Sequence, residues 1–208
     1  MSFAVIDTRG RLRGEQVHRQ FVTASVVKAM LLVAYLDKLD RNGKPLTQEA
    51  RRHLDPMIRV SSNHAATVIY RRVGDRGLHR LARRSGMTRF SVCCSWARAQ
   101  ITAADQARFF IRFDELTPRQ HRSYARRLLS TVVQSQSWGI PSVARPRYTV
   151  FWKIGFRHTQ RGVLVHQASL LEGRGRRFSM VVLTDGDPSY GYGIATIRGV
   201  ASRLLATP

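Results

Sequence analysis

The segment Phe21-Val22-Thr23-Ala24-Ser25-Val26-Val27-Lys28 leads into an apolar stretch that continues to Leu39. Apolar residues occupy nearly every face of a helix drawn over residues 25–39, so the pattern predicts a helix buried on all sides. Ser25 falls in the first turn, where free backbone N–H groups and the helix dipole favour negative charge. Lys28 follows three residues later, so its amine and the Ser25 hydroxyl share one face. A lysine in such a helix loses solvation, which lowers its pKa and suits it to act as a base.

The basic composition strengthens the case for Lys28. Of the 35 lysine and arginine residues only four are lysines, at positions 28, 38, 44 and 153. A guanidinium cannot lose its proton at a workable pH, whereas an amine can. Lys38 and Lys44 flank a turn and are typical of surface lysines. Lys28 is therefore a position where the chemistry requires an amine.

Two further segments carry polar residues that suit an active site. The first is Met57 to Ala66, which contains Ser61-Ser62-Asn63 just before a predicted helix, and simple helix capping is the alternative interpretation. The second is Lys153-Ile154-Gly155 on a predicted strand, and a solvated strand edge followed by a turn is the alternative there. Gly155 would allow a ligand to approach the backbone closely.

Taken together, the three segments resemble the class A β-lactamases and the related penicillin-binding D,D-peptidases. The signatures of that family are S-x-x-K, S-D-N and K-T-G, in this order. The matching residues here are Ser25 to Lys28, Ser61 to Asn63 and Lys153 to Gly155. The flanks are similar too, because Gly139-Ile140-Pro141 stands where the family has G-L-P before its third motif.

The resemblance implies a role for each matching residue. Ser25 would be the acylated nucleophile and Lys28 its base, and Ser61 would pass a proton to the leaving group. Lys153 would supply positive charge near Ser61 and the substrate carboxylate. Asn63 would hold the substrate amide through its side chain, and Gly155 would let the substrate come close to the backbone. The N–H groups of Ser25 and Phe156 would form the oxyanion hole. The family chemistry needs neither a cofactor nor a metal ion.

Several departures from the family pattern weaken the expectation of β-lactam hydrolysis. Ser62 replaces the aspartate of the second motif, and Ile154 replaces the hydroxyl residue of the third. Class A enzymes also use a glutamate to activate the water that releases the acyl group. Glu115 is the single glutamate between Asn63 and Lys153, and it lies too far along the chain for that role. We therefore expect an acyl-enzyme at Ser25 from an amide, ester or β-lactam-type substrate, and poor β-lactamase activity.

The predicted elements place strands at both ends of the chain and helices in the middle. The strands are expected at residues 3–7, 148–153, 163–171 and 178–184, and a hairpin joins the last two. Helices are expected at 25–39, 47–54, 65–73, from Thr102 onward, at 119–133 and at 194–205. The fold class is therefore α/β (α+β), a β-lactamase-like antiparallel sheet flanked by helices with an inserted helical lobe. Residues 1–22 plus 140–208 would form the sheet lobe and 23–139 the helical lobe of one catalytic domain.

Composition bounds the remaining possibilities. Arginine-rich codon usage, which scatters basic side chains over every face, is the preferred explanation of the formal net charge of +22, and an anionic polymer as partner is the alternative. The alternative function is a catalytically weak protein that binds a ligand or such a polymer. Nucleic acid ranks last as a partner, because the basic residues are dispersed in pairs without interleaved aromatic residues. The absence of a G-x-S-x-G elbow disfavours a Ser-His-Asp hydrolase. Cys93 and Cys94 are adjacent, so two small buried thiols are expected in place of a mutual disulfide.

The expected partner is therefore a small-molecule or peptide-like substrate. The longest apolar run in the first half, residues 29–36, is too short to span a bilayer. After Met1 the chain passes directly into the strand-like residues 3–7, so no signal peptide is expected. The family resemblance by contrast implies a location outside the cytoplasmic membrane.

Overall fold

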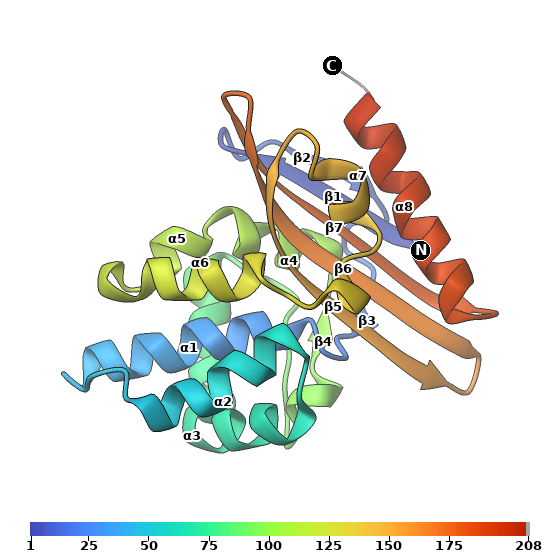
Figure 1. Cartoon of the computed structure of the whole chain (residues 1–208). Helices are drawn as coiled ribbons and strands as arrows, with labels where there is room; N and C mark the ends of the chain where they lie inside the picture. Colours follow the sequence, from blue (N-terminus) through green and yellow to red (C-terminus); the bar gives the residue numbers. More distant parts are fainter. Residues whose placement is uncertain (207–208) are drawn as a thin grey trace.

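Strands from both ends of the chain form one five-stranded antiparallel sheet in the computed structural model, which describes residues 1–206. The strand order across the sheet is β2-β1-β7-β6-β5. The strands are β1 (Ser2–Asp7), β2 (Leu12–Glu15), β5 (Thr149–Thr159), β6 (Gly162–Gly173) and β7 (Arg176–Asp187). Figure 1 shows the amino-terminal strands beside the long carboxy-terminal hairpins. The antiparallel sheet predicted from strand-like segments at the two chain ends is confirmed.

Helices cover both faces of this sheet. Helices α7 (Ile140–Ala144) and α8 (Tyr190–Ala206) pack on one face, where the Gln167 side chain of β6 accepts from the Ile140 N–H (2.7 Å). Helix α4 (Ala103–Ile111) packs on the other face against β1 and β7. Figure 1 shows the remaining helices beyond α4, away from α8. This arrangement is the predicted α/β class.

The middle of the chain forms the remaining helices. They are α1 (Val27–Arg41), α2 (Gln48–Arg59), α3 (Asn63–Ser85), α5 (Phe113–Leu116) and α6 (Arg122–Ser130), with short 3₁₀ turns at Trp96–Arg98, Arg119–His121 and Gln134–Gln136. A two-stranded ribbon of β3 (Phe21–Val22) and β4 (Gln100–Ile101) lies beside them. None of the helices within residues 1–206 has the length and hydropathy needed to cross a bilayer.

Several predicted helix boundaries were wrong for local reasons. Helix α1 begins at Val27, because the chain makes a tight turn over residues 24–26 first. Helix α3 is longer than predicted, because a kink at Gly74 (φ 70°) joins two helical pieces. Thr102 does cap α4 as predicted, since its hydroxyl accepts from the Asp105 N–H at 3.1 Å.

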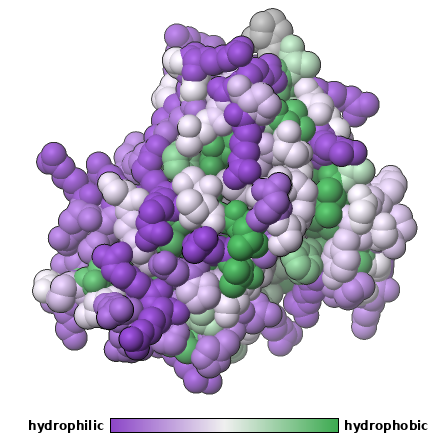
Figure 2. All heavy atoms as spheres, viewed as in Figure 1, coloured by the Kyte–Doolittle hydropathy of each residue, from purple (hydrophilic) through white to green (hydrophobic). Residues whose placement is uncertain are grey.

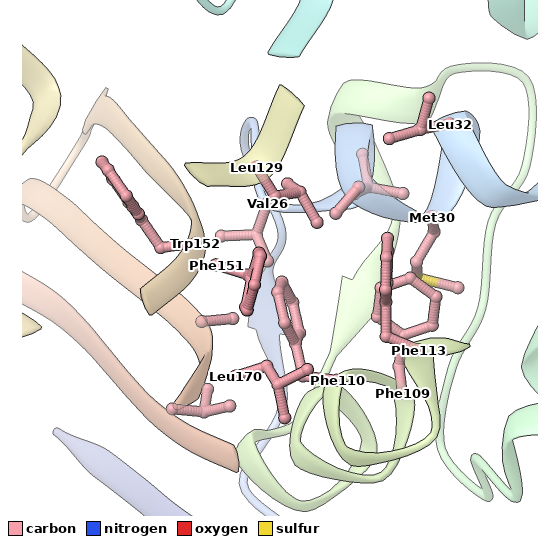
Figure 3. Packing of buried hydrophobic residues seen from close by; sticks show 14 of the residues in the cluster. Val26, Met30, Leu32, Phe109, Phe110, Phe113, Leu129, Phe151, Trp152 and Leu170 are labelled. Carbon is pink, nitrogen blue, oxygen red and sulfur yellow. The ribbon is translucent and has the colours of Figure 1, made fainter. Parts of the chain in front are cut away.

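Helix α1 is the centre of the hydrophobic core. Its residues 27–33 are fully buried, which confirms the helix predicted to be apolar on all faces. Aromatic rings from α4 and α5 pack against it, and Figure 3 shows Phe109 and Phe113 around Met30. Phe109 makes edge-on contacts with Phe110 (5.3 Å) and Phe113 (6.0 Å). The position of the turn before α1 is therefore fixed by a rigid, well-packed helix.

The expectation for the cysteines was wrong. Cys93 and Cys94 are exposed and form a disulfide between neighbouring residues. Cys94 has a left-handed backbone (φ 68°), and its N–H donates to the Asp75 carboxylate at 3.2 Å. This turn brings the two side chains together in a loop at the surface.

The surface is dominated by charged and polar residues, and Figure 2 shows hydrophilic side chains over much of one face. Large hydrophobic side chains that are exposed within residues 1–206 are few: Met1, Val60, Phe156 and Tyr192. One cluster of charges is partly buried and joins the helices to the sheet. Arg126 of α6 and Arg177 of β7 both donate to Asp114 of α5, at 2.7 and 2.8 Å, and both also pair with Glu172 of β6.

We expect Asp114→Asn to lower the free energy of unfolding by about 1–2 kcal/mol, between the values for exposed and buried ion pairs. The loss follows because two guanidinium groups would then share one carboxylate. Chemical denaturation at low and high salt measures it, and the difference should shrink as salt rises. Glu115→Gln is the matched control, because the Arg112–Glu115 pair is exposed. Equal effects of the two variants would contradict a structural role for the cluster.

Candidate active site

Ser25 lies in the tight turn between β3 and α1. Ala24 has a left-handed backbone (φ 47°), and the Thr23 hydroxyl accepts from the Val27 N–H at 3.1 Å. The Thr23 N–H donates to the Ala99 carbonyl at 2.8 Å, which ties the turn to β4. Ser25 itself is half-buried, and its hydroxyl has no hydrogen-bond partner in the part of the chain that the structure describes. The turn therefore holds a partly exposed hydroxyl at the start of a buried helix.

The Lys28 amine lies one turn further along and is buried. It donates to the Ser61 carbonyl (2.5 Å), the Ser61 hydroxyl (3.2 Å) and the Asn63 side-chain oxygen (2.8 Å). Burial lowers the pKa of this amine to about 7 from an ordinary 10.5. Lys28 can therefore exchange a proton near neutral pH, as the sequence predicted for a lysine in a helix buried on all sides.

Lys153 reaches the same hydroxyl from the sheet. It is fully buried in the middle of β5, and its amine donates to Ser61 Oγ at 3.0 Å and to the Ile154 carbonyl at 3.3 Å. Burial holds its pKa well below the ordinary value, and repulsion from Lys28 lowers it further. The solvated strand edge considered for Lys153 is therefore wrong. The Ser61 hydroxyl lies between two amines, and neither amine has a carboxylate partner among the ion pairs of residues 1–206.

Ser61 owes its position to the loop between α2 and α3. Its backbone is left-handed (φ 60°), and the next residue, Ser62, caps α3 by accepting from the Ala65 N–H at 3.2 Å. The capping alternative is thus correct for Ser62 and wrong for Ser61, whose hydroxyl faces the amines. Asn63 is exposed and binds Lys28 through its side-chain oxygen.

Gly155 is the point of closest approach between β5 and the turn at Ser25. A Cβ atom at Gly155 would lie 3.0 Å from the Ser25 nitrogen and 3.0 Å from the Thr23 oxygen. The next residue, Phe156, is 49% exposed and makes an edge-on contact with Tyr190 of α8 (5.3 Å). The main chain of β5 at Gly155 therefore lies close to the main chain of the turn at Ser25. Ile154 is fully buried and offers no hydroxyl, in keeping with the departure seen in the sequence.

The acidic residues of this part of the chain are engaged away from the amines. Glu115 pairs with Arg112 at 3.0 Å on the exposed side of α5. Asp105 is fully buried, but its carboxylate accepts from the Thr88 and Arg89 N–H groups at 3.0 Å each. Neither Glu115 nor Asp105 therefore takes the place of the glutamate that the family pattern has and this sequence lacks.

Sequence reasoning missed Trp96. Its ring lies over the Lys28 amine, 4.8 Å from the nitrogen to the ring centre, and its N–H donates to the Thr67 hydroxyl at 3.2 Å. No motif or spacing pointed to this residue, which lies in the loop before α4. Within residues 1–206 no group of three or more His, Cys, Asp or Glu side chains could hold a metal ion.

Comparison with known proteins places the chain in a family. The sequence profile of the Beta-lactamase enzyme family matches residues 45–207, which include the second and third motifs and begin after Ser25 and Lys28. The chain therefore belongs to the β-lactamase enzyme family. No sequence among curated proteins is significantly similar to it.

Solved structures agree on the fold. A variant of a reconstructed ancestral class A β-lactamase of Gram-negative bacteria has a TM-score of 0.84 at 19% identity, covering 99% of this chain and 91% of that one. A β-lactamase from Sphaerobacter thermophilus has a TM-score of 0.83 at 15% identity, with 99% and 90% covered. A protein described as PBP-A has a TM-score of 0.81 at 17% identity, with 99% and 88% covered. The class A β-lactamase fold predicted from the three motifs is confirmed.

We expect Gly155→Ala to lower the acylation rate of Ser25 and to cost about 1–3 kcal/mol of stability, because the added methyl group meets backbone atoms that cannot rotate away. Gly199→Ala is the matched control: a Cβ there meets nothing within 4 Å, and alanine in α8 should stabilise the protein by about 0.5–1 kcal/mol. Thermal unfolding and labelling of Ser25 measure both effects. A Gly155→Ala protein that acylates at the normal rate would contradict the close approach.

Proposed function

We propose that this protein is a serine hydrolase that forms an acyl-enzyme at Ser25 with an amide, ester or β-lactam-type substrate. The observation that carries the proposal is the Ser61 hydroxyl, which lies 3.2 Å from the Lys28 amine and 3.0 Å from the Lys153 amine. A hydroxyl between two amines with lowered pKa values is suited to pass a proton in either direction. Family membership and fold support the same class of chemistry.

Lys28 is the base for the first step. In its neutral form it has two N–H groups, whose hydrogens the Ser61 carbonyl and the Asn63 oxygen can accept, and one lone pair that can accept from a hydroxyl. The lone pair takes the proton of the Ser25 hydroxyl as Ser25 Oγ attacks the substrate carbonyl. Because the pKa of Lys28 is about 7, half of the molecules hold the neutral form at that pH.

The tetrahedral intermediate then collapses to an ester on Ser25. The N–H groups of Ser25 and Phe156 stabilise its oxyanion while the C–N or C–O bond of the leaving group breaks. The proton held by Lys28 passes through Ser61 Oγ to the leaving nitrogen or oxygen. A substrate carboxylate near Ser61 would favour the protonated form of Lys153 and so gain an ion pair with it.

Release of the acyl group is the slow step in this proposal. Water attack on the ester needs a base, and the amines of Lys28 and Lys153 have no nearby carboxylate to help them. The acid product and free Ser25 would form only as fast as Lys28 or Ser61 could deprotonate a water molecule. Because acylation of Ser25 is faster than release of the acyl group, we expect poor β-lactamase activity.

The energetic cost of the site favours an enzyme over a protein that only binds a polymer. Two buried amines without carboxylate partners destabilise the folded state, because their charged forms lose solvation. Perturbed pKa values of this kind cluster at functional sites. The arginine pairs on the surface would serve a binding protein equally well without this cost.

A mass measurement after incubation with a penicillin or a fluorophosphonate tests the proposal. We expect one adduct on Ser25, and none on Ser25→Ala. Lys28→Arg should lose acylation by about a hundredfold or more, because arginine keeps the charge but cannot take the proton. In the normal protein the rate should rise with pH through about 7, as Lys28 becomes neutral. Lys44→Arg is the matched surface control, and an unlabelled Ser25 with every probe would refute the proposal.

We also expect acylation to outrun release. A β-lactam should give a burst of about one equivalent followed by a slow steady state, because nothing activates the deacylating water. Stopped-flow absorbance measures the burst, and intact-mass spectrometry shows how long the adduct lasts. Rapid multiple turnover without a burst would show that another group activates the water.

A further inference from the structure

The indole ring of Trp96 lies over the Lys28 amine. The indole ring is 8% exposed and lies with its centre 4.8 Å from the Lys28 nitrogen. Its N–H donates to the Thr67 hydroxyl at 3.2 Å, and that hydroxyl in turn donates to the Asn63 carbonyl at 3.1 Å. The ring is thus linked to the same residue that binds the Lys28 amine. An aromatic face has no hydrogen-bonding group with which to hold a water molecule beside the amine.

The loop that carries Trp96 is fastened along its length. Asp105 binds the beginning of the loop at Thr88 and Arg89, and His79 contacts the Val92 carbonyl at 3.2 Å. Asp75 binds Cys94, and the Ala99 carbonyl accepts from the Thr23 N–H at 2.8 Å. Hydrogen bonds at both ends and in the middle of the loop hold the indole in one place, so it does not act as a mobile lid.

We propose that Trp96 is a positioning residue that seals the Lys28 side of the site against water, thereby setting the protonation of the amine and prolonging the life of the acyl-enzyme. This inference rests on the proposed acylation of Ser25. It adds a second cause for slow release besides the missing carboxylate, because an indole ring covers part of the Lys28 amine and leaves less room there for water.

The groups that face Lys28 come from three elements. Trp96 faces it from the loop before α4, Ser61 and Asn63 face it from the α2–α3 loop and the start of α3, and the Lys153 amine is the titratable group on β5. Truncating Trp96 has two opposite effects on the pKa of Lys28. Water would solvate the ammonium and raise the pKa, whereas losing the ring's attraction for the cation would lower it. We expect solvation to win, because burial is what lowers this pKa.

The experiment measures two properties in Trp96→Ala, Trp96→Phe and Trp138→Phe. NMR of protein with ¹³C-labelled lysine side chains follows the amines directly, and with four lysines in the chain the spectrum is simple to assign. We expect Trp96→Ala to raise the pKa of Lys28 by about one unit or more, and to move the midpoint of the acylation rate by the same amount. The acyl-enzyme lifetime should fall by about tenfold as water enters.

Trp96→Phe keeps a ring over the amine, so both properties should stay near those of the normal protein. Trp138→Phe is the matched control, because Trp138 lies before α7, on the other side of the sheet, and should change nothing. If Trp96→Ala does not fold, Trp96→Leu replaces it, with the same direction of effect. A truncated variant that acylates at Ser25 with unchanged pKa and unchanged lifetime would overturn the inference.

The design separates failure of the inference from failure of the proposed function. The NMR titration needs no acylation, so it reports the seal over Lys28 even if Ser25 proves unreactive. If the pKa of Lys28 rises in Trp96→Ala but Ser25 is never labelled, the proposed acyl-enzyme is refuted and the proposed role of Trp96 is supported. Labelling of Ser25 with an unchanged pKa and lifetime would keep the acyl-enzyme and refute the seal.

Discussion

The burial of the Lys28 amine without a carboxylate partner is the constraint on which the rest of the site depends. An unpaired amine inside a protein is tolerated at neutral pH when it can give up its proton, and here burial lowers the pKa to about 7. The surrounding elements meet this requirement in different ways. The α2–α3 loop supplies neutral oxygen acceptors, β5 supplies a second amine, and the loop before α4 supplies an aromatic ring. A carboxylate in any of these places would keep Lys28 charged.

The fold offsets the cost of this arrangement by packing. Helix α1 carries Lys28 through the middle of the core, with aromatic rings from α4 and α5 on one side. Acidic residues of the same region work at a distance from the amines: Asp105 fastens a loop, and Asp114 joins the helices to the sheet. The carboxylates of Asp105 and Asp114 thus bind groups that connect structural elements, whereas the amines of the site have no carboxylate partner among residues 1–206. The division into a sheet lobe and a helical lobe at residues 22–23 and 139–140 stays a prediction.

Within its family, the chain combines a retained fold with an altered set of side chains. Ser62 caps a helix where the family motif has an aspartate, and Ile154 is buried where the family motif has a hydroxyl residue. The first change removes a carboxylate and the second removes a hydroxyl. Together with the indole of Trp96 over the Lys28 amine, they leave few charged groups around a buried lysine. A dry site strengthens every remaining electrostatic interaction, including those to a developing oxyanion.

The sequence by itself determined the fold class and the order of the three motifs, because apolar periodicity and residue spacing are local properties. The burial of Lys28 also followed from the apolar stretch around it. The tertiary structure decided which residues meet: the contact of Trp96 with Lys28, the disulfide at Cys93 and Cys94, and the choice of Ser61 over Ser62 to face the amines. These depend on loop conformations such as the left-handed backbone at Ser61 and Cys94. Hydrogen bonds between segments far apart in the chain set such conformations, so local sequence patterns do not predict them.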